Sequence, residues 1–507
     1  MLQSLLAACG TVLTPMNILV IFAGAAVGIF VGAMPGLSSI MGLSLMLPVT
    51  LKFDGTTGIL MLLGVFCGAI YGGSITAILI KTPGTANSAA TVLDGYPLTQ
   101  KGQAARALGV STFASTFGGI FSAIMLLWTA PLLSKVALSF TSPEYFSLAI
   151  LGLSMVTSLS SKNVTKGLIS AVLGLLMATV GMDTLTGVKR FTFGTTYLLG
   201  GLSMVPVLIA LYAFAQVMQN IETDGQTQRP EREKLRHVFP NGKIIKKIMP
   251  TLLRSSVIGT VLGAIPGIGG DIACWMSYNE ARRFDKHPEE FGTGRIEGVA
   301  APEAANNAIS GGALIPLLTL GIPGAAGTAV MLGALMMQGI VPGPLLFQTQ
   351  QTEVYSIIVG LLLANIAMGV IGFAGIRLFA RIGSVKNRYM VPIVVMFCVI
   401  GTFALNSSIN DVFMMMIVGV IAWFLIKLDY PMPPVILGLI LGSQLERNLQ
   451  RSLSLSGGSF AIFFTRPISC ILLVIAVLSV FLPLIIRSVK KLIAGKRGAK
   501  AQESRPA

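Results

Sequence analysis

Charged residues are scarce in this sequence. Asp, Glu, Lys and Arg make up 11% of its 507 residues, whereas soluble domains carry about 25%. Hydrophobic residues make up 53%, and the mean hydropathy is +0.80. Few segments of such a chain could remain in water, so the composition excludes a soluble globular protein and predicts one that lies in a membrane.

Motifs of common catalytic and ATP-binding sites are also missing. There is no Walker A, HExxH or GxSxG sequence, so we expect neither an ATP-driven protein nor an enzyme. The two histidines lie in polar segments, where they indicate no metal site. Five cysteines lack metal or redox spacing, so we expect packing residues and no cofactor beyond a coupling ion: Cys9, Cys67, Cys274, Cys398 and Cys470.

The net charge of +16 is concentrated in short segments. Residues 222–248, 377–388 and 487–507 are rich in Lys and Arg, which places them in the cytoplasm by the positive-inside rule. They lack the interleaved aromatics of an RNA-binding patch, so we expect no nucleic-acid partner. Residues 1–14 have no basic region and the first lysine is Lys52, so no cleaved export signal is expected.

Long apolar runs predict an all-α polytopic protein with 11 to 14 crossings of a bilayer, because about 20 apolar residues span one. These runs cover residues 16–33, 57–80, 107–133, 145–159, 167–182, 196–217, 252–265, 308–320, 326–341, 354–380, 389–405, 411–426 and 463–486.

Two motifs occur twice, in the same order. The sequence of residues 28–36, Gly-x-x-x-Gly-Ala-Met-Pro-Gly, returns at 259–267 with one changed residue. Residues 69–73, followed by a Pro-Gly pair at Pro83, return at 308–312, followed by a Pro-Gly pair at Pro323. The separations are 231 residues for Pro35 and Pro266, 239 for Gly72 and Gly311, and 240 for Pro83 and Pro323. We infer a duplication with repeats at 15–221 and 249–486, a linker at 222–248 and a basic tail at 487–507.

The two repeats are predicted to have inverted topology, with Pro-Gly-broken helices or re-entrant hairpins. Lys101 and Arg106 precede the long apolar run at 107–133, which therefore leaves the cytoplasm. Its counterpart at 354–380 is followed by a basic loop and enters the cytoplasm. The linker is then cytoplasmic, and the C-terminus lies on the same side if residues 432–443 form one further crossing.

Four Pro-Gly breaks lie inside apolar sequence, and they predict the functional site. Proline and glycine interrupt a helix, and paired interruptions in two related halves indicate a transporter's binding site. The N–H groups of a half-helix favour an anion, and hydroxyls and amides add donors. Candidate substrate-binding residues are Pro35, Gly36, Ser38, Ser39, Tyr71, Thr82, Pro83, Gly84, Thr85, Asn87, Pro266, Gly267, Gly269, Asn307, Pro323 and Gly324. Candidate cation-coupling residues are Asp271, Glu303, Asn306, Asn307 and Ser310.

Several of these residues have a simpler interpretation. The ladder of Gly24, Gly28 and Gly32 is typical of close helix packing. Lys81 could extend to the membrane interface instead of pairing with a carboxylate. Asp271 and Glu303 could each be a loop residue or a helix N-cap, although acids near apolar sequence are usually functional.

These motifs resemble one family, the large membrane subunit TctA of the tripartite tricarboxylate transporters. The resemblance is carried by residues 32–37, by 82–86 with Asp94-Gly95-Tyr96-Pro97, and by Ala-Pro-Glu-Ala-Ala-Asn-Asn at 301–307. It implies a bacterial inner-membrane importer of citrate or related carboxylates, driven by sodium or protons. It also implies two partners, a small membrane subunit like TctB and a periplasmic binding protein like TctC; a homodimer of the large and small pair is a further alternative. Ser38 and the sequence Gly269-Gly270-Asp271 depart from the family pattern.

We therefore interpret the chain as a secondary active carrier of small carboxylates. A channel or a membrane scaffold without coupled transport is the alternative, although a channel is expected to show rings of charge or a filter. Sodium is favoured as the coupling ion, because it needs only oxygen ligands, which Asn306 and Asn307 provide beside Glu303.

Reporter fusions test the inverted topology. Fusions after residues 106, 240, 386 and 500 should report a cytoplasmic location, and one near 137 a periplasmic location. A periplasmic signal at 386 would contradict the inversion, because the two long apolar runs would then cross in the same direction.

Overall fold

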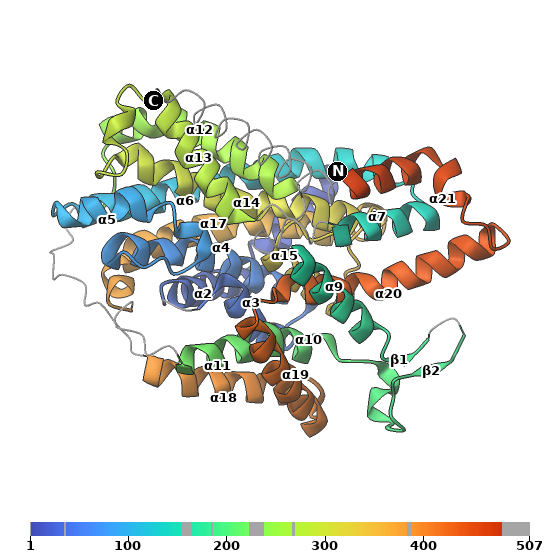
Figure 1. The fold of residues 1–507 in the computed structure, drawn as a ribbon. Helices are drawn as coiled ribbons and strands as arrows, with labels where there is room; N and C mark the ends of the chain where they lie inside the picture. Colours follow the sequence, from blue (N-terminus) through green and yellow to red (C-terminus); the bar gives the residue numbers. More distant parts are fainter. Residues whose placement is uncertain are drawn as a thin grey trace, which may run out of the picture. The chain divides into compact units, whose positions relative to one another are not determined.

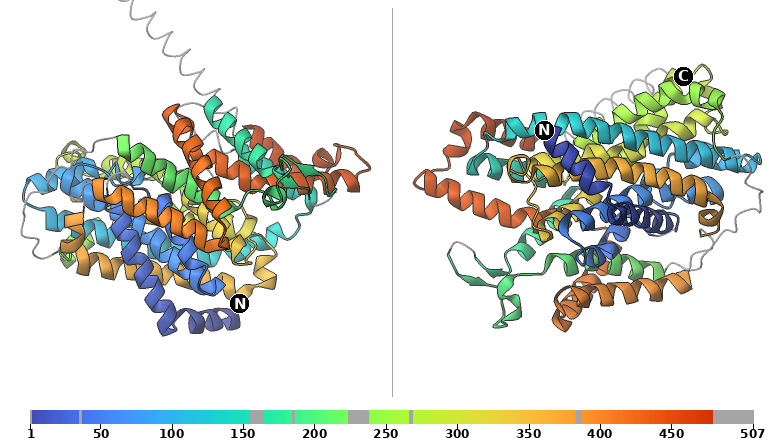
Figure 2. Two further views of the ribbon diagram at one scale, coloured as in Figure 1. Left: turned by 90° about the horizontal axis from the view of Figure 1, so that it is seen from below. Right: turned by 180° about the vertical axis from the view of Figure 1, so that it is seen from behind.

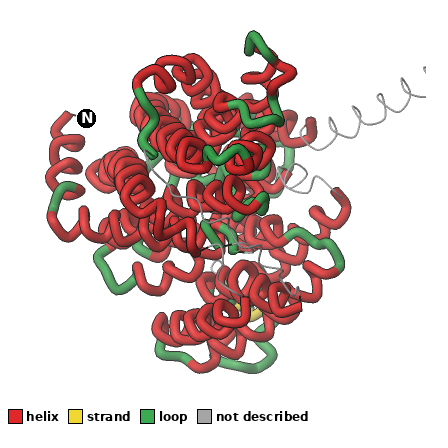
Figure 3. The backbone as a smooth tube through the Cα atoms, turned by 90° about the vertical axis from the view of Figure 1, so that its left-hand side faces the viewer, coloured by secondary structure: helices red, strands yellow, loops and turns green. Residues whose placement is uncertain are grey.

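The computed structural model describes residues 2–34, 37–154, 164–183, 186–222, 238–265, 269–382 and 387–478. Helix makes up most of this described part, as Figure 3 shows. The chain forms two compact units, one of residues 1–139, 180–182 and 191–432, and one of residues 140–179, 183–190 and 433–507.

The larger unit holds the helices that carry the predicted motifs (Figure 1). Its elements are α1 (Leu2–Val12), α2 (Pro15–Gly32), α3 (Ser39–Thr50), α4 (Gly55–Ile80), η1 (Ala86–Ser88), α5 (Val92–Gln100), α6 (Ala104–Ala137), β1 (Gly181–Met182), η2 (Tyr197–Gly200), α10 (Met204–Leu208), the π-helix η3 (Ile209–Phe214), α11 (Ala215–Glu222), α12 (Gly242–Ala264), α13 (Gly270–Phe284), η4 (Pro288–Glu290), α14 (Ile296–Leu320), α15 (Ala326–Met337), α16 (Leu346–Thr349), α17 (Gln351–Ile382), α18 (Asn387–Asn406) and α19 (Ile409–Lys427).

The smaller unit is built on α7 (Ser142–Ser154), α9 (Val164–Ala178), α20 (Met432–Leu455) and α21 (Ile462–Thr465), with the short strand β2 (Lys189–Arg190). Helices α9 and α20 approach closely, because a Cβ atom on Gly174 or Gly438 would overlap with a backbone carbonyl of the other helix. The buried carboxylate of Glu144 accepts a hydrogen bond from Arg466.

The predicted all-α membrane architecture is confirmed. Among the described residues, five helices are long and apolar enough to cross a membrane, namely Pro15–Gly32, Gly55–Ile80, Ala104–Lys135, Gln351–Ile376 and Ile409–Lys427. Among the described α-helices, five lie outside the predicted apolar runs, namely α1, α3, α5, α13 and the short α16, while α20 includes the further predicted crossing at 432–443. Helix α13 extends to Phe284 and so continues into polar sequence.

Matching signals end the two helices that precede the second Pro-Gly break of each half, although only the first of these helices begins with a side-chain cap. Asp54 caps α4 by accepting a hydrogen bond from the Thr57 N–H at 3.1 Å. Helix α4 ends at Lys81, which has a positive φ of 58°, and α14 ends at Gly321, with φ of 73°. Each left-handed residue is followed by a Pro-Gly pair, which prevents the helix from continuing.

Glycine makes the central helix pairs possible. A Cβ atom on Gly28 would overlap with the carbonyl oxygen of Val65, so α2 and α4 touch backbone to backbone. In the second half, Gly259 lies in the same way against the carbonyl of Ala305, which joins α12 to α14. The ladder of small residues at Gly24, Gly28 and Gly32 is therefore a packing surface.

The packing corrects one detail of the sequence alignment. Gly72 lies against Ile29 and Gly312 against Thr260. Since Ile29 and Thr260 are 231 residues apart, like the first motifs, Gly72 corresponds to Gly312 and the separation is 240 residues. The pairing of Gly72 with Gly311 was wrong by one position, because adjacent glycines at 72–73 and 311–312 make the two registers look alike. The inversion of the halves stays a prediction.

Each half supplies a long helix to the other half. Helix α6, from the first half, packs along α14, and α17, from the second, packs along α4. The same four helices run alongside one another in Figures 1 and 2. The interrupted helices α4 and α14 are thus held between both halves, and their side chains are almost entirely buried.

A matched pair of glycine substitutions tests this packing. Alanine at Gly28 or Gly259 should lower the unfolding free energy by about 1–3 kcal/mol, because the added methyl group forces the helices apart. Gly10→Ala is the control, since nothing lies within 4 Å of a Cβ atom there. Thermal unfolding of the three purified variants in detergent measures the effect. Equal midpoints for all three would contradict the described contacts.

Candidate functional site

The breaks of the two halves lie against glycine backbone. Gly84, in the break after α4, has its Cα beside the carbonyl of Gly32, the last residue of α2. Gly324, in the break after α14, lies in the same way against Gly263, where a Cβ atom would be 2.6 Å from the carbonyl oxygen. In each half the second break therefore meets the end of the helix that leads into the first break.

Contacts also join the breaks of different halves. The Asn87 side chain lies against Gly270, at the start of α13, so closely that a Cβ atom there would overlap with it. Within the second half, Ala325 packs on a small apolar cluster that includes Ala273 of α13 and Ile309 of α14, which joins the two breaks of that half. Helix α15 packs on α3. The breaks thus form one connected region.

Several hydroxyls at the breaks, including that of the candidate Ser38, are used by local caps. Ser88 Oγ donates to the Thr85 carbonyl at 2.8 Å, and Thr328 Oγ1 donates to the Ala325 carbonyl at 2.8 Å. Ser38 Oγ accepts the Met41 N–H at 3.1 Å and so begins α3. These bonds satisfy N–H and carbonyl groups that each break releases.

The other candidates for substrate binding lie in different surroundings. Tyr71 is fully buried and its hydroxyl bonds Thr112 at 2.6 Å, so it joins α4 to α6. Thr82 is exposed, and its hydroxyl donates to the Ile80 carbonyl. Ser39 and Asn87 are half-buried. Four candidates lie outside the described residues: Pro35, Gly36, Pro266 and Gly267.

Glu303 lies at the centre of the polar residues. Its side chain is completely buried on α14, and three hydroxyls reach its carboxylate. Thr91 Oγ1 donates to one oxygen at 2.5 Å, and Ser111 and Ser115 of α6 donate to the other at 3.1 and 2.9 Å. Within the described ranges, no lysine or arginine forms an ion pair with it. An ionised carboxylate here would have no compensating charge, so the site favours a bound proton or a bound cation.

One turn further along α14, two buried amide groups carry unused oxygens. Asn306 donates its N–H to the Ile70 carbonyl at 3.3 Å, and Asn307 donates to the Cys67 carbonyl at 3.4 Å. The side-chain oxygen of each is buried without a hydrogen-bond partner, and so is that of Asn365 on α17. A buried acceptor without a partner costs about 1–3 kcal/mol, which makes a ligand at these oxygens favourable.

The remaining coupling candidates differ in burial. Ser310 is buried, and its hydroxyl donates to the Asn307 carbonyl at 2.6 Å. Asp271, by contrast, lies in the first turn of α13 with an exposed side chain. Of the two acids that the sequence singles out, only Glu303 lies among the buried oxygens.

Asp94, in the Asp-Gly-Tyr-Pro motif, joins α5, which follows the second break of the first half, to the loop between α13 and α14. It is completely buried. One carboxylate oxygen accepts the N–H groups of Gly292, Gly294 and Arg295 at 2.7–3.0 Å, and the other accepts the Tyr278 hydroxyl at 2.8 Å. Four donors satisfy this carboxylate, so its role is to hold the loop.

Ion pairs reinforce the same loop. Arg295 contacts Asp285 at 2.7 Å and Glu297 at 3.2 Å. Burial opposes ionisation of Asp285, but the His287 N–H and the Arg295 guanidinium outweigh it and hold the pKa of that carboxyl below its usual range. The loop therefore keeps its charge pairs through the neutral pH range.

Sequence reasoning missed the partners of the buried polar groups. Ser111 and Ser115 are one helical turn apart in an apolar run, and Asn365 interrupts another. Their spacing signals a polar stripe on a helix, but serine in apolar helices commonly bonds its own backbone. Only the packing of α6 on α14 reveals that Glu303 faces them.

Comparisons with known proteins agree with these observations. The family described as the tripartite tricarboxylate transporter TctA family matches residues 18–437. A 52.8 kDa protein of Agrobacterium vitis, named for the TAR-I ttuC' 3' region, is 37% identical over 475 residues, which cover 94% of each chain. A second protein of that organism, named for the TAR-II ttuC' 3' region, is 36% identical over 227 residues, 45% of this chain and 94% of its own length. No solved structure matches the chain.

Proposed function

Because the chain belongs to the tripartite tricarboxylate transporter TctA family, we propose that it carries small carboxylates across the bacterial inner membrane, driven by a sodium gradient. The observation that supports this most is the meeting of broken helices beside a buried acid and unpaired amide oxygens. Anion and cation ligands then lie in neighbouring parts of one region, as coupled transport requires.

The carboxylate is proposed to bind at the breaks. Helices α3, α13 and α15 each begin immediately after a break. Their N-terminal N–H groups carry partial positive charge, which attracts an anion where water is scarce. Ser39, Thr85 and Asn87 add side-chain hydrogen-bonding groups of the kind that citrate or a related acid needs.

Sodium is proposed to bind on α14. The side-chain oxygens of Asn306 and Asn307 have no partner, and Glu303 supplies a negative charge one turn away. A small hard cation prefers such oxygen ligands, so these residues fit sodium. The cation would also neutralise the carboxylate when the carrier changes conformation.

The family implies further components. We propose a small membrane subunit like TctB, and a periplasmic binding protein like TctC that delivers the carboxylate. The linker 222–248 and the C-terminal tail are proposed to lie in the cytoplasm, on the grounds of their basic residues.

Alanine substitutions test the proposed ligands. Alanine at Ser39 or Thr85 should weaken carboxylate uptake at sub-saturating substrate by about tenfold, because loss of a hydrogen bond to a charged partner costs about 1.5–3 kcal/mol. Alanine at Asn307 should also weaken uptake, because it removes a proposed oxygen ligand of sodium. Met46→Ala and Met336→Ala are controls on α3 and α15. Uptake by proteoliposomes that contain both membrane subunits and the purified binding protein is the measurement. If all five variants transport like the unmodified protein, these side chains are not ligands.

A further inference from the structure

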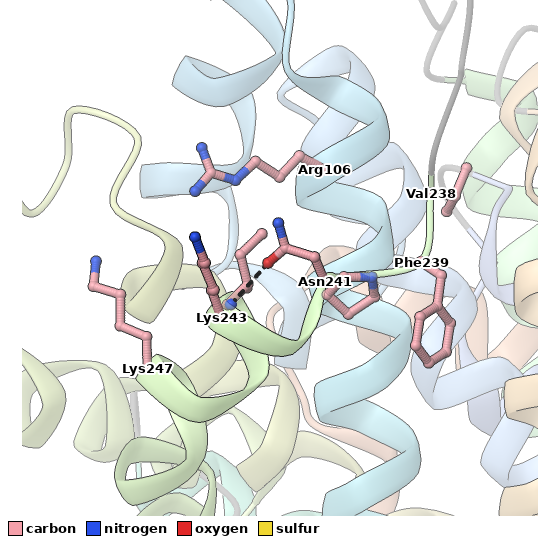
Figure 4. A pocket seen from close by; sticks show the side chains of 8 residues that line it. Arg106, Val238, Phe239, Asn241, Lys243 and Lys247 are labelled. Atoms are coloured by element: carbon pink, nitrogen blue, oxygen red, sulfur yellow. Dashed lines mark hydrogen bonds between the residues drawn. The ribbon is translucent and has the colours of Figure 1, made fainter.

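A basic cavity lies away from the breaks, where α12 begins beside α6. Its volume is about 710 Å³. Figure 4 shows that Arg106, Lys243 and Lys247 extend their charged ends to the same side of it. The residues that line it are Arg106, Val238, Phe239, Pro240, Asn241, Lys243, Ile244 and Lys247.

The positive charge of this cavity is only partly compensated. Lys247 pairs with Glu297 at 2.8 Å. Arg106 bonds the neutral side chain of Gln103 at 3.0 Å, and Lys243 forms no ion pair in the described part of the chain. The N-terminal ends of α6 and α12 add partial positive charge, since both helices begin here. Two cations are thus available for an anion.

The opposite wall of the cavity is apolar. Phe239 packs between Phe113 of α6 and Phe373 of α17, with ring centroids 6.3 and 5.0 Å apart. Even so, 62% of the Phe239 side chain is exposed. The carbonyl of Val238 lies directly against Gly109, and this contact holds residues 238–239 on α6. An occupant would therefore meet cations on one side and, on the other, an apolar surface continuous with two membrane-crossing helices.

We propose that this cavity binds the headgroup of an anionic phospholipid of the cytoplasmic leaflet. The phosphate would contact Arg106 and Lys243, and the acyl chains would lie along Phe239 and the apolar faces of α6 and α17. Basic cavities between membrane helices on the cytoplasmic side suit such headgroups. A free inorganic anion would use the cations but would leave the apolar wall exposed. The inference does not depend on which solute is carried.

Native mass spectrometry of the purified full-length chain in neutral detergent tests this proposal. The chain is titrated with phosphatidylglycerol or with phosphatidylcholine, and bound lipids are counted. Phosphatidylglycerol should bind preferentially. Arg106→Gln and Lys243→Gln should each weaken that binding about fivefold, and the double variant on the order of 25-fold, since each cation contributes separately near the surface.

Lys246→Gln is the matched control, because this lysine is on the same helix but outside the cavity lining. The side chains of Arg106, Lys243 and Lys246 are all exposed, so the variants should fold like the unmodified chain. Thermal unfolding checks this. Equal binding of the two lipids, or an equal loss in Lys246→Gln, would overturn the proposal. So would stabilisation by millimolar inorganic phosphate without any preference for phosphatidylglycerol, since that result would identify a free-anion site.

Discussion

A helix that ends inside a membrane leaves backbone groups that hydrocarbon cannot bind, and the larger unit depends on how it satisfies them. Gly84 N–H donates to the Gly73 carbonyl at 3.0 Å, and the Thr85 and Ala325 caps satisfy further groups. Glycine at Gly32 and Gly263 lets the neighbouring helix come close enough to enclose each break. The same close approach brings α4 and α14 between the long helices α6 and α17, and thereby buries the polar residues of α14.

That burial gives Glu303 its importance. A carboxylate surrounded by hydroxyls, without a basic partner in the described residues, is stable when it shares a proton or a cation. On the same helix, the side-chain oxygens of Asn306 and Asn307 have no hydrogen-bond partner. A carrier that changes conformation with this site empty and charged would have to move an uncompensated charge through a low-dielectric region. Transport would be coupled to the cation because of that cost, since the site is neutral only when a cation or a proton is bound.

Much of the fold could be predicted because its signals are local. Apolar length identified the crossing helices, and the repeated Pro-Gly pairs located the helix ends at Lys81 and Gly321. The sequence alone could not show the partners of Glu303, since Ser111 and Ser115 are nearly 200 residues away along the chain and become neighbours only through α6. From the sequence alone, Asp271 and Glu303 were equally good candidates for cation coupling. Both are acids beside a break, but only packing makes one exposed and the other buried.

Sodium-driven uptake by the unmodified protein and by Glu303→Gln tests the central claim most directly. Proteoliposomes with the partner subunits would receive an inward sodium gradient at constant pH, then an inward proton gradient without sodium. We expect the unmodified protein to accumulate carboxylate only with the sodium gradient. We also expect Glu303→Gln to bind sodium more weakly and to need a higher sodium concentration for the same uptake. Uptake that ignores sodium and follows the proton gradient in the unmodified protein would contradict it.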